Sequence, residues 1–305
     1  MTAHLRGRPV VVGVDGSDSS ADAASAAVEE AARRGTELHL VHALSWPAAA
    51  APASGMGPAG ASGLGGFLHA AAETALRTAA ADAADALGPD RVRWSVVPGA
   101  PATALTDAAR GAEVLVLGSR GAGGVTGLLL GSTAAAILAE PPCPVLLMPD
   151  PTAAVVRPRA TVVVAVEGRP DDDAVLAFAF PEAARRQTDL LAVHAWQDVA
   201  LETALLSAGP LVDWAGVLAD ERRVLAEALA GWRDKEPDVT VREAVVRDRP
   251  ARALLAAGLT AQVLVLGSRR HRALARLGST TRAVVHRAPC PVAVVPLDLH
   301  RGSSR

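Results

Sequence analysis

LGSRGAGGVTGLLLGST, residues 117–133, joins the apolar run VLVL (114–117) to the helix-like segment STAAAILAE (132–140). A strand, a glycine-rich loop and a helix in this order form a common phosphate-binding arrangement in α/β proteins. Glycine permits positive φ angles and, lacking a Cβ, lets a ligand approach the backbone amides; the glycines here are Gly118, Gly121, Gly123, Gly124, Gly127 and Gly131. Ser132 and Thr133 add hydroxyls and free N–H groups at the positive end of the following helix. The loop therefore predicts a nucleotide ligand.

The chain contains the same pattern twice. Residues 10–46 align with residues 162–198. The later matches are VVPGAPATAL (96–105) with VVRDRPARAL (245–254), AEVLVLGSR (112–120) with AQVLVLGSR (261–269), and PPCPVLLMP (141–149) with APCPVAVVP (288–296). A repeat of this length indicates a duplicated domain. We expect one domain over residues 1–150, a linker over 151–160 and a second domain over 161–305.

Each half alternates strand-like and helix-like segments. The run VVVGV (10–14) is typical of a strand buried on both faces of a parallel sheet. In the first half we expect strands at 10–14, 37–44, 91–97, 113–118 and 144–149, and helices ending near Gly35, ending near Leu87, and starting at Pro101 and at Ser132. The segment 46–66, rich in Ala, Gly and Pro, is expected to be a mobile loop. This alternation predicts an α/β fold with a parallel sheet and helices on both faces.

Such sheets bind ligands at the carboxyl ends of their strands, where the strand order reverses. Asp15 follows the first strand, and Gly118 ends the fourth. If these strands are neighbours, both residues face one crevice.

Composition excludes several classes of protein. The 305 residues include 30 basic and 32 acidic ones, so no basic field is present to attract nucleic acid or anionic lipid. Aromatic residues make up 3% of the chain, and no Tyr occurs, which argues against the stacking of single-stranded nucleic acid. No apolar run is long enough for a membrane span or a signal peptide, so a cytoplasmic protein is expected. Cys143 and Cys290 are expected to be buried, reduced thiols.

The motifs together resemble those of the universal stress protein family. They are a V-x-V-D-G-S first strand, an L-x-V-H second strand, a V-x-x-G-x-P third element, and Gly118-x-x-Gly121-x9-Gly131-Ser132 followed by Pro-Cys-Pro-Val. The resemblance covers nearly the whole chain twice, as in tandem members of the ATP-binding branch. It implies two tandem Rossmann-like domains, each with a five-stranded parallel sheet in the order 3-2-1-4-5.

The resemblance also implies an ATP site in the first domain. Asp15 and Ala43 would lie at the adenine and ribose end, and Leu117 and Gly118 along the nucleoside. The phosphates, with Mg²⁺ shared between them and solvent, would lie against Gly121, Gly131, Ser132 and Thr133. No side chain is assigned as a metal ligand. A carboxylate suits ribose hydroxyls and bare amides suit phosphate, which agrees with a ribose end at Asp15 and a phosphate end at the glycines.

The second half departs from this pattern. Its corresponding residues are Glu167, Ala195, Gly267, Gly278, Ser279 and Thr280. Arg270 stands in place of Gly121, and the interval between the flanking glycines is shorter by two residues. An arginine there removes an open amide and adds a guanidinium that either fills the pocket or binds phosphate. The arginines of this loop also have the simpler interpretation of a solvated surface. We expect firm binding of nucleotide in the first domain and weak or no binding in the second.

Each candidate residue also has a structural alternative. Asp15 could cap the first helix, and Ser132 and Thr133 could cap the helix that follows the loop. His42 and His194, at the end of the second strand, are better explained as hydrogen-bonded core or rim histidines than as catalytic bases.

Catalysis has little support from the sequence. There is no GxxxxGK[ST] motif, and no recognisable catalytic triad or metal-ligand cluster. We expect an ATP-binding sensor or regulator of the stress response, with no assigned catalytic residue and at most slow hydrolysis. The alternatives are a nucleotide-free scaffold of the same family and a slow ATPase.

The last strand of each half is apolar, and an exposed apolar edge favours pairing. We therefore predict that PVLLMP (144–149) and PVAVVP (291–296) pair with each other within one chain. The sequence leaves open whether two chains also associate as a homodimer.

Overall fold

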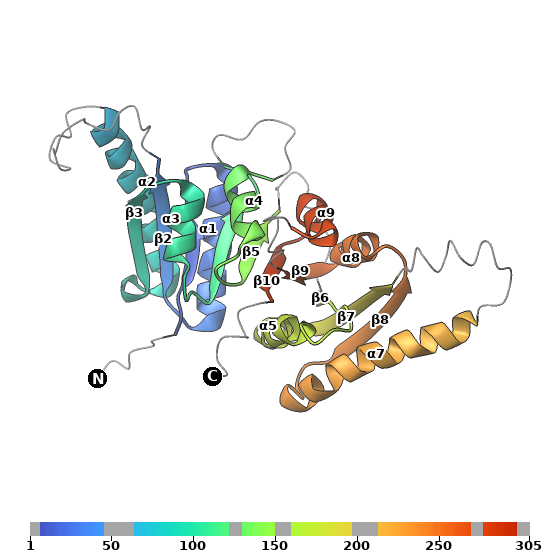
Figure 1. Cartoon of the computed structure of the whole chain (residues 1–305). Helices are drawn as coiled ribbons and strands as arrows, with labels where there is room; N and C mark the ends of the chain where they lie inside the picture. The colour runs from blue at the N-terminus through green and yellow to red at the C-terminus, as the bar shows by residue number, and fades with distance from the viewer. Residues whose placement is uncertain are drawn as a thin grey trace, which may run out of the picture. The chain divides into compact units, whose positions relative to one another are not determined.

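The computed structural model describes residues 7–45, 64–121, 130–149, 160–196, 213–269 and 277–297. The chain divides into two compact units, Met1–Thr152 and Ala153–Arg305 (Figure 1). The predicted linker lies outside the described residues, except for Ala160.

The first unit alternates strands and helices as the sequence predicts. Its elements are β1 (Val10–Gly13), α1 (Asp18–Arg34), β2 (Leu38–Leu44), α2 (Leu64–Leu87), the 3₁₀ turn η2 (Pro89–Arg91), β3 (Val92–Pro98), α3 (Pro101–Ala108), β4 (Val114–Gly118), α4 (Ser132–Ala139) and β5 (Val145–Met148). The strands pair in parallel in the order β3-β2-β1-β4-β5. The predicted order 3-2-1-4-5 is confirmed.

The second unit repeats this arrangement. Its elements are β6 (Thr161–Ala165), α5 (Asp172–Arg185), β7 (Asp189–Trp196), α7 (Trp214–Lys235), β8 (Val241–Arg247), α8 (Pro250–Gly258), β9 (Ala261–Ser268), α9 (Ser279–Arg287) and β10 (Val292–Pro296). The strand order β8-β7-β6-β9-β10 is the same as in the first unit.

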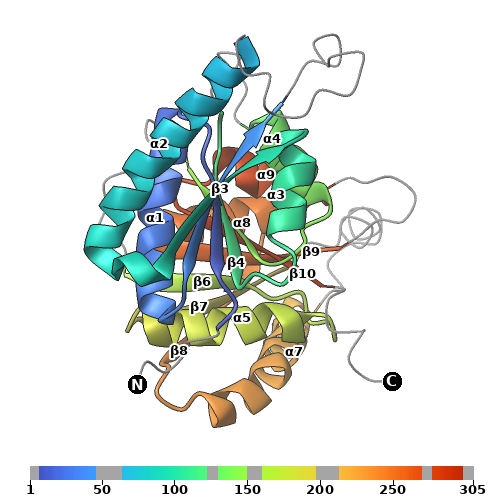
Figure 2. The same cartoon turned by 90° about the vertical axis from the view of Figure 1, so that its left-hand side faces the viewer.

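Helices cover both faces of each sheet. Figure 2 shows α1 and α2 on one face of the first sheet, with α3 and α4 on the other. In the second unit, α5 and α7 lie on one face and α8 and α9 on the other (Figure 1). A central strand covered on both sides has no solvated face, which is why Val10, Val11 and Val12 are consecutive and fully buried.

Local signals set the limits of α1. Ser17 is the N-cap, and its hydroxyl accepts a hydrogen bond from the Ser20 amide. Gly35 ends the helix in the left-handed conformation, at φ 64°, where glycine has no steric penalty. The predicted end near Gly35 is confirmed.

Buried ion pairs fix the far ends of α1 and α5 in the same way. Glu30 pairs with Arg34 at 3.1 Å, and Glu182 pairs with Arg186 at 2.6 Å. Both glutamates are buried. A buried carboxylate without its cation would be costly, so each pair stabilises the last turns of its own helix.

Two further expectations can be compared with the structure. Helix α2 begins at Leu64, so the expected loop over 46–66 is wrong for its last three residues, and 46–63 lie outside the described residues. Cys143 and Cys290 are free and buried, as expected. Burial raises the pKa of the Cys143 thiol to about 12. Within the described ranges, no helix is long and apolar enough to cross a membrane.

Candidate functional site

In the first domain, the predicted site residues gather at the carboxyl ends of β1 and β4. These strands are neighbours, with Val12 opposite Val116. Asp15 follows β1, and Gly118 is the last residue of β4. The condition that the first and fourth strands are neighbours is therefore met, and Asp15 and Gly118 lie at the same edge of the sheet.

Gly118 allows the start of α1 to approach β4 closely. An added Cβ would lie 2.6 Å from the carbonyl oxygen of Ser19 and 2.8 Å from its carbonyl carbon. The Arg120 amide also donates to the Ser19 hydroxyl over 3.4 Å. A side chain at residue 118 would thus push the first turn of α1 away from the sheet.

Gly121 lies directly against Asp15. A Cβ on Gly121 would be 2.5 Å from Oδ2 of Asp15. The other carboxylate oxygen accepts hydrogen bonds from the Ser17 amide at 3.0 Å and the Ser17 hydroxyl at 2.6 Å. Asp15 therefore orders the turn before α1 and is not its N-cap, which is Ser17. Asp15, whose carboxylate is predicted to bind ribose, thus lies beside Gly121, the first of the residues predicted to lie against the phosphates.

The two ends of the loop meet. The Gly131 amide donates to the Ser119 carbonyl over 2.7 Å, and a Cβ on Gly131 would lie 3.7 Å from the Gly121 nitrogen. Residues 122–129, which include Gly123, Gly124 and Gly127, lie outside the described residues.

Gly131 is the N-cap of α4, and it provides no side-chain hydrogen bond to the helix. The alternative that Ser132 or Thr133 caps this helix is wrong, because both already belong to its first turn. Ser132 is exposed and Thr133 is half-buried. The first-turn amides of α4 thus face the crevice end of the loop, with no side-chain cap among the described residues.

Ala43 and Leu117 lie at the same edge of the sheet, on β2 and β4. Val41 lies opposite Gly13 in the sheet, so Ala43 extends the edge of β2 to the level of Asp15. Leu117 is buried, and its side chain packs near Gly13. Only the backbone of Leu117 is therefore suited to contact a ligand at this edge.

Ser119 is a residue that sequence reasoning missed. Its hydroxyl is buried without a hydrogen-bond partner in the described part of the chain. A buried hydroxyl without a partner is unfavourable, and a ligand in the loop could supply that partner. The repeated Gly-Ser-Arg after both fourth strands was the available signal.

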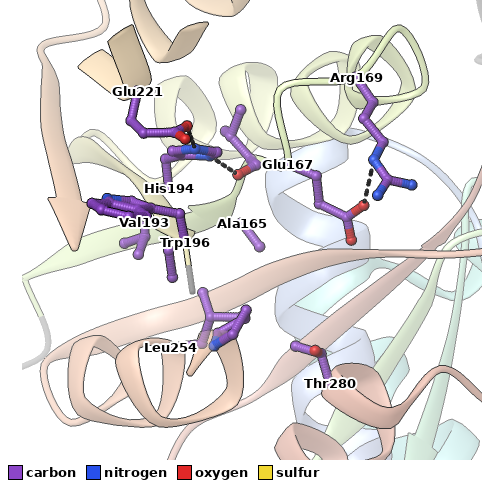
Figure 3. A pocket seen from close by; sticks show the side chains of 12 residues that line it. Ala165, Glu167, Arg169, Val193, His194, Trp196, Glu221, Leu254 and Thr280 are labelled. Atoms are coloured by element: carbon purple, nitrogen blue, oxygen red, sulfur yellow. Dashed lines mark hydrogen bonds and ion pairs between the residues drawn. The ribbon is translucent and has the colours of Figure 1, made fainter. Parts of the chain in front are cut away.

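In the second domain, a cavity of about 490 Å³ opens at the carboxyl ends of β6 and β7 (Figure 3). Predicted site residues in its lining are Glu167, Ala195 and Thr280. The remaining lining residues are Ala165, Val166, Arg169, Val193, His194, Trp196, Glu221, Pro250 and Leu254.

Glu167 is in a different electrostatic setting from Asp15. Its Oε2 is 3.0 Å from Arg269 Nη2 and 3.6 Å from Arg169 Nε. Arg269 also lies 3.5 Å from Asp171. A ribose hydroxyl would therefore compete with two guanidinium groups for the carboxylate of Glu167.

A buried carboxylate holds the turn after β6. Asp172 accepts hydrogen bonds from the Glu167 amide at 3.0 Å and the Arg169 amide at 2.8 Å. Burial raises the pKa of Asp172, and the backbone hydrogen bonds oppose that shift. The side chain of Asp172 is thus the acceptor for the amides of Glu167 and Arg169.

Of the other predicted residues of the second domain, Gly267 has a packing role, and Gly278, Ser279 and Thr280 form the start of α9. A Cβ on Gly267 would lie 2.9 Å from the side chain of Leu297. Gly278 is the N-cap of α9, and Ser279 and Thr280 begin the helix. Arg270 lies outside the described residues.

The two strand-two histidines differ. His194 is buried, with Nδ1 2.9 Å from the Val166 carbonyl and Nε2 2.8 Å from Glu221 on α7. The prediction of a hydrogen-bonded histidine is confirmed for His194. For His42 it is wrong at one nitrogen, because the buried Nδ1 has no partner in the described ranges.

Across those same ranges, no group of three or more His, Cys, Asp or Glu side chains could hold a metal ion.

Comparison with known proteins identifies the protein family to which the chain belongs. The model of the universal stress protein family matches residues 7–149 and again 158–296. The chain therefore belongs to the universal stress protein family, as a member with two tandem domains.

Full-length relatives support this assignment. The universal stress protein Rv2005c of Mycobacterium tuberculosis is 36% identical over 93% of this chain and 96% of its own. Rv2623 of the same organism is 34% identical over 93% and 95%. A crystal structure of a universal stress protein from Archaeoglobus fulgidus covers 96% of this chain and 100% of its own, with a TM-score of 0.65 and 19% identity. This last likeness concerns the fold alone.

Proposed function

We propose that the first domain binds ATP with Mg²⁺, and that the protein acts as a cytoplasmic sensor or regulator in the stress response. The observation that supports this most directly is the contact between Asp15 and Gly121. It brings a carboxylate suited to ribose hydroxyls beside Gly121, the glycine at which the proposed phosphate-binding end begins.

The phosphate end of this proposed site is built from backbone. Gly121 and Gly131 lie side by side without side chains, and α4 starts immediately after them. The N-terminal end of a helix is electropositive and offers unpaired N–H groups. Ser132 and Thr133 would add hydroxyl donors, and the buried Ser119 hydroxyl lies in the same loop.

The nucleoside end would lie along the strand edges. Asp15 would accept hydrogen bonds from the ribose, with the base against Ala43 and the nucleoside along the backbone of Leu117 and Gly118. Mg²⁺ would neutralise phosphate charge and share its coordination with solvent.

Binding rather than catalysis is the proposed activity. Fast hydrolysis requires groups that position water and stabilise charge in the transition state. The chain has no P-loop lysine, since its single lysine, Lys235, ends α7 in the other domain. We therefore propose that ATP occupancy itself is the signal, with at most slow hydrolysis.

We propose that the second domain binds ATP more weakly. Glu167 is already paired with two arginines, and Asp172 already occupies the amides of the turn after β6. Nucleotide would have to displace or bypass these internal contacts.

We further propose that residues 151–160 link the domains and that β5 and β10 pair within the chain. Each is the last strand in its own domain's order, and each is apolar in sequence. Expression of residues 1–155 alone tests the pairing, because a freed apolar edge should cause dimerisation; a strictly monomeric first domain would contradict it.

The test of ATP binding starts with protein purified without added nucleotide. Mass analysis of the ligand released on denaturation should show an adenine nucleotide, and empty protein should bind added Mg-ATP in calorimetry. Gly121→Arg should abolish this binding by filling the space beside Asp15. The matched control is Gly231→Arg on α7, where an added Cβ would meet no described atom within 4 Å. Protein that is empty and also ignores Mg-ATP would contradict the proposal.

A further inference from the structure

His194 and Glu221 form a fixed polar pair in the wall of the second domain's cavity. The imidazole lies between the Val166 carbonyl, 2.9 Å from Nδ1, and the Glu221 carboxylate, 2.8 Å from Nε2 (Figure 3). Contacts at both ring nitrogens hold the imidazole in one orientation. This arrangement orients the carboxylate on α7 toward the end of β7.

The His194–Glu221 pair occurs in the second domain and has no counterpart at the corresponding positions of the first. Counting back from β3 and β8, the fully buried Leu76 of α2 corresponds to the fully buried Leu225 of α7. At the same spacing, Glu221 corresponds to Ala72, which is 5% exposed and has no polar side chain. The first domain therefore presents a methyl group where the second presents a carboxylate.

Helix α7 is also packed tightly at this point. The methyl groups of Val224 lie against Gly168, whose φ of 75° only glycine adopts readily. His194 lies close to the same glycine, with Cε1 3.8 Å from the position of an added Cβ. Packing by Val224 and the hydrogen bond from His194 together limit the movement of Glu221.

The cavity that Glu221 lines has apolar side chains beside its charged ones. Ala195 and Trp196 line the same cavity, as do the apolar side chains of Val193 and Leu254. The indole Nε1 of Trp196 is buried without a partner in the described part of the chain. Only Oε2 of Glu221 is used by His194, which leaves Oε1 free of hydrogen bonds within that part of the chain. The wall thus offers one free carboxylate acceptor beside an apolar surface.

A carboxylate oxygen accepts a hydrogen bond from an amino group and repels a carbonyl oxygen. A charge-assisted hydrogen bond is stronger than a neutral one, and a misplaced acceptor leaves both groups unpaired. We infer that Glu221, positioned by His194, makes the cavity of the second domain selective for a heterocycle with an exocyclic amino group, an adenine-type over a hypoxanthine-type base. The inference rests on the proposed binding of adenine nucleotides by this fold, and it adds a base selectivity that the first domain lacks at the same position.

Adenosine and inosine test the selectivity, because they differ in this amino group and lack phosphates. Full-length protein is titrated with each nucleoside while tryptophan fluorescence is recorded, and the Trp196→Phe variant assigns the signal to the second domain. Adenosine should bind more tightly than inosine, on the order of tenfold. Equal affinities for the two, or no signal from Trp196 with either, would overturn the inference.

Substitutions then test the role of Glu221. In Glu221→Gln, an amide that can donate or accept should reduce the preference to about twofold or less. Glu227→Gln, an exposed glutamate on the same helix, is the matched control and should keep the preference. Thermal unfolding of each variant shows that it is folded. A preference that survives in Glu221→Gln would overturn the assignment to Glu221.

The tests of ATP binding by the first domain and of base selectivity in the second domain are independent of each other. Binding of Mg-ATP by wild-type protein, and its loss in Gly121→Arg, report on the first domain whatever the nucleosides do. If Mg-ATP binds while adenosine and inosine are not distinguished, only the inference about the second domain is wrong.

Discussion

The turn after the first strand is built on similar backbone in the two domains but held by different side chains. Gly16 and Gly168 have φ angles of 83° and 75°. In the first domain, Asp15 accepts from Ser17, and Ser17 caps α1. In the second, Asp172 accepts from two amides of the turn. The duplicated domains thus keep the same backbone turn, while the carboxylate that holds it comes from a different position in each.

The consequence is electrostatic. In the first domain, one carboxylate oxygen of Asp15 lies against the bare Gly121. In the second, the carboxylate of Glu167 is engaged by Arg169 and Arg269. The two carboxylates therefore differ in their partners, which include Ser17 for Asp15 and two arginines for Glu167.

The largest effect is expected from a methyl group at the end of the fourth strand. In Gly118→Ala, the new Cβ would meet the backbone of Ser19, which cannot rotate away. Gly267→Ala, the matched variant in the second domain, would meet only the side chain of Leu297. We expect Gly118→Ala to lower the free energy of unfolding by about 3 kcal/mol and Gly267→Ala by about 1 kcal/mol. Urea unfolding measures both; equal losses would show that the close approach is not specific to the first domain.

A smaller effect is expected from the buried carboxylate of the second domain. Asp172→Ala removes an acceptor from two backbone amides and should lower the free energy of unfolding by about 2 kcal/mol. Asp172→Asn should cost less, because its carbonyl oxygen can accept both hydrogen bonds. Urea unfolding at pH 7 ranks the variants, and similar losses for both would contradict this role of the oxygen.

The same residue predicts a pH dependence with a definite sign. Because burial raises the pKa of Asp172 in the folded protein, its contribution to stability is greatest below its ordinary value of 3.8 and is lost as pH rises through the raised pKa. Asp172→Asn cannot ionise, so its stability relative to wild type should increase as pH rises from below 4 toward 7. Unfolding free energies across this range measure the difference. A relative stability that falls over the range would contradict the raised pKa.

The smallest effect is expected from the arginine pairs of the second domain. Arg269→Gln removes its ion pair with Glu167, whose side chain is 60% exposed. Exposed pairs contribute little to stability, so the unfolding midpoint should hardly change. Binding of nucleotide by the second domain should instead strengthen, because one of the two guanidinium groups at the Glu167 carboxylate is removed. Calorimetry in the Gly121→Arg background isolates this domain; weaker binding would show that Arg269 holds phosphate.

Much of the fold could be predicted from the sequence. Consecutive β-branched residues such as Val10–Val12 are informative because a strand buried on both faces tolerates no polar residue. The meeting of Asp15 with Gly121 was also predictable, since both follow neighbouring parallel strands. The start of α2 was not, because Gly65 and Gly66 are poor helix formers.

The details of the second site were beyond sequence reasoning for a different reason. Glu221 reaches His194 only because of how α7 is rotated about its axis, and no local pattern fixes that angle. Likewise, one of three consecutive aspartates, Asp172, is buried under the turn while Asp173 is exposed. Choosing between them requires knowing how the turn after β6 is folded.

The stoichiometry of Mg-ATP binding to the full chain tests the asymmetry of the two domains most directly. Calorimetry on wild-type protein should give one strong site per chain, and Arg270→Gly should add or strengthen a second site without changing the first. Two sites of equal affinity in wild-type protein would contradict the account, as would strong binding that survives Gly121→Arg.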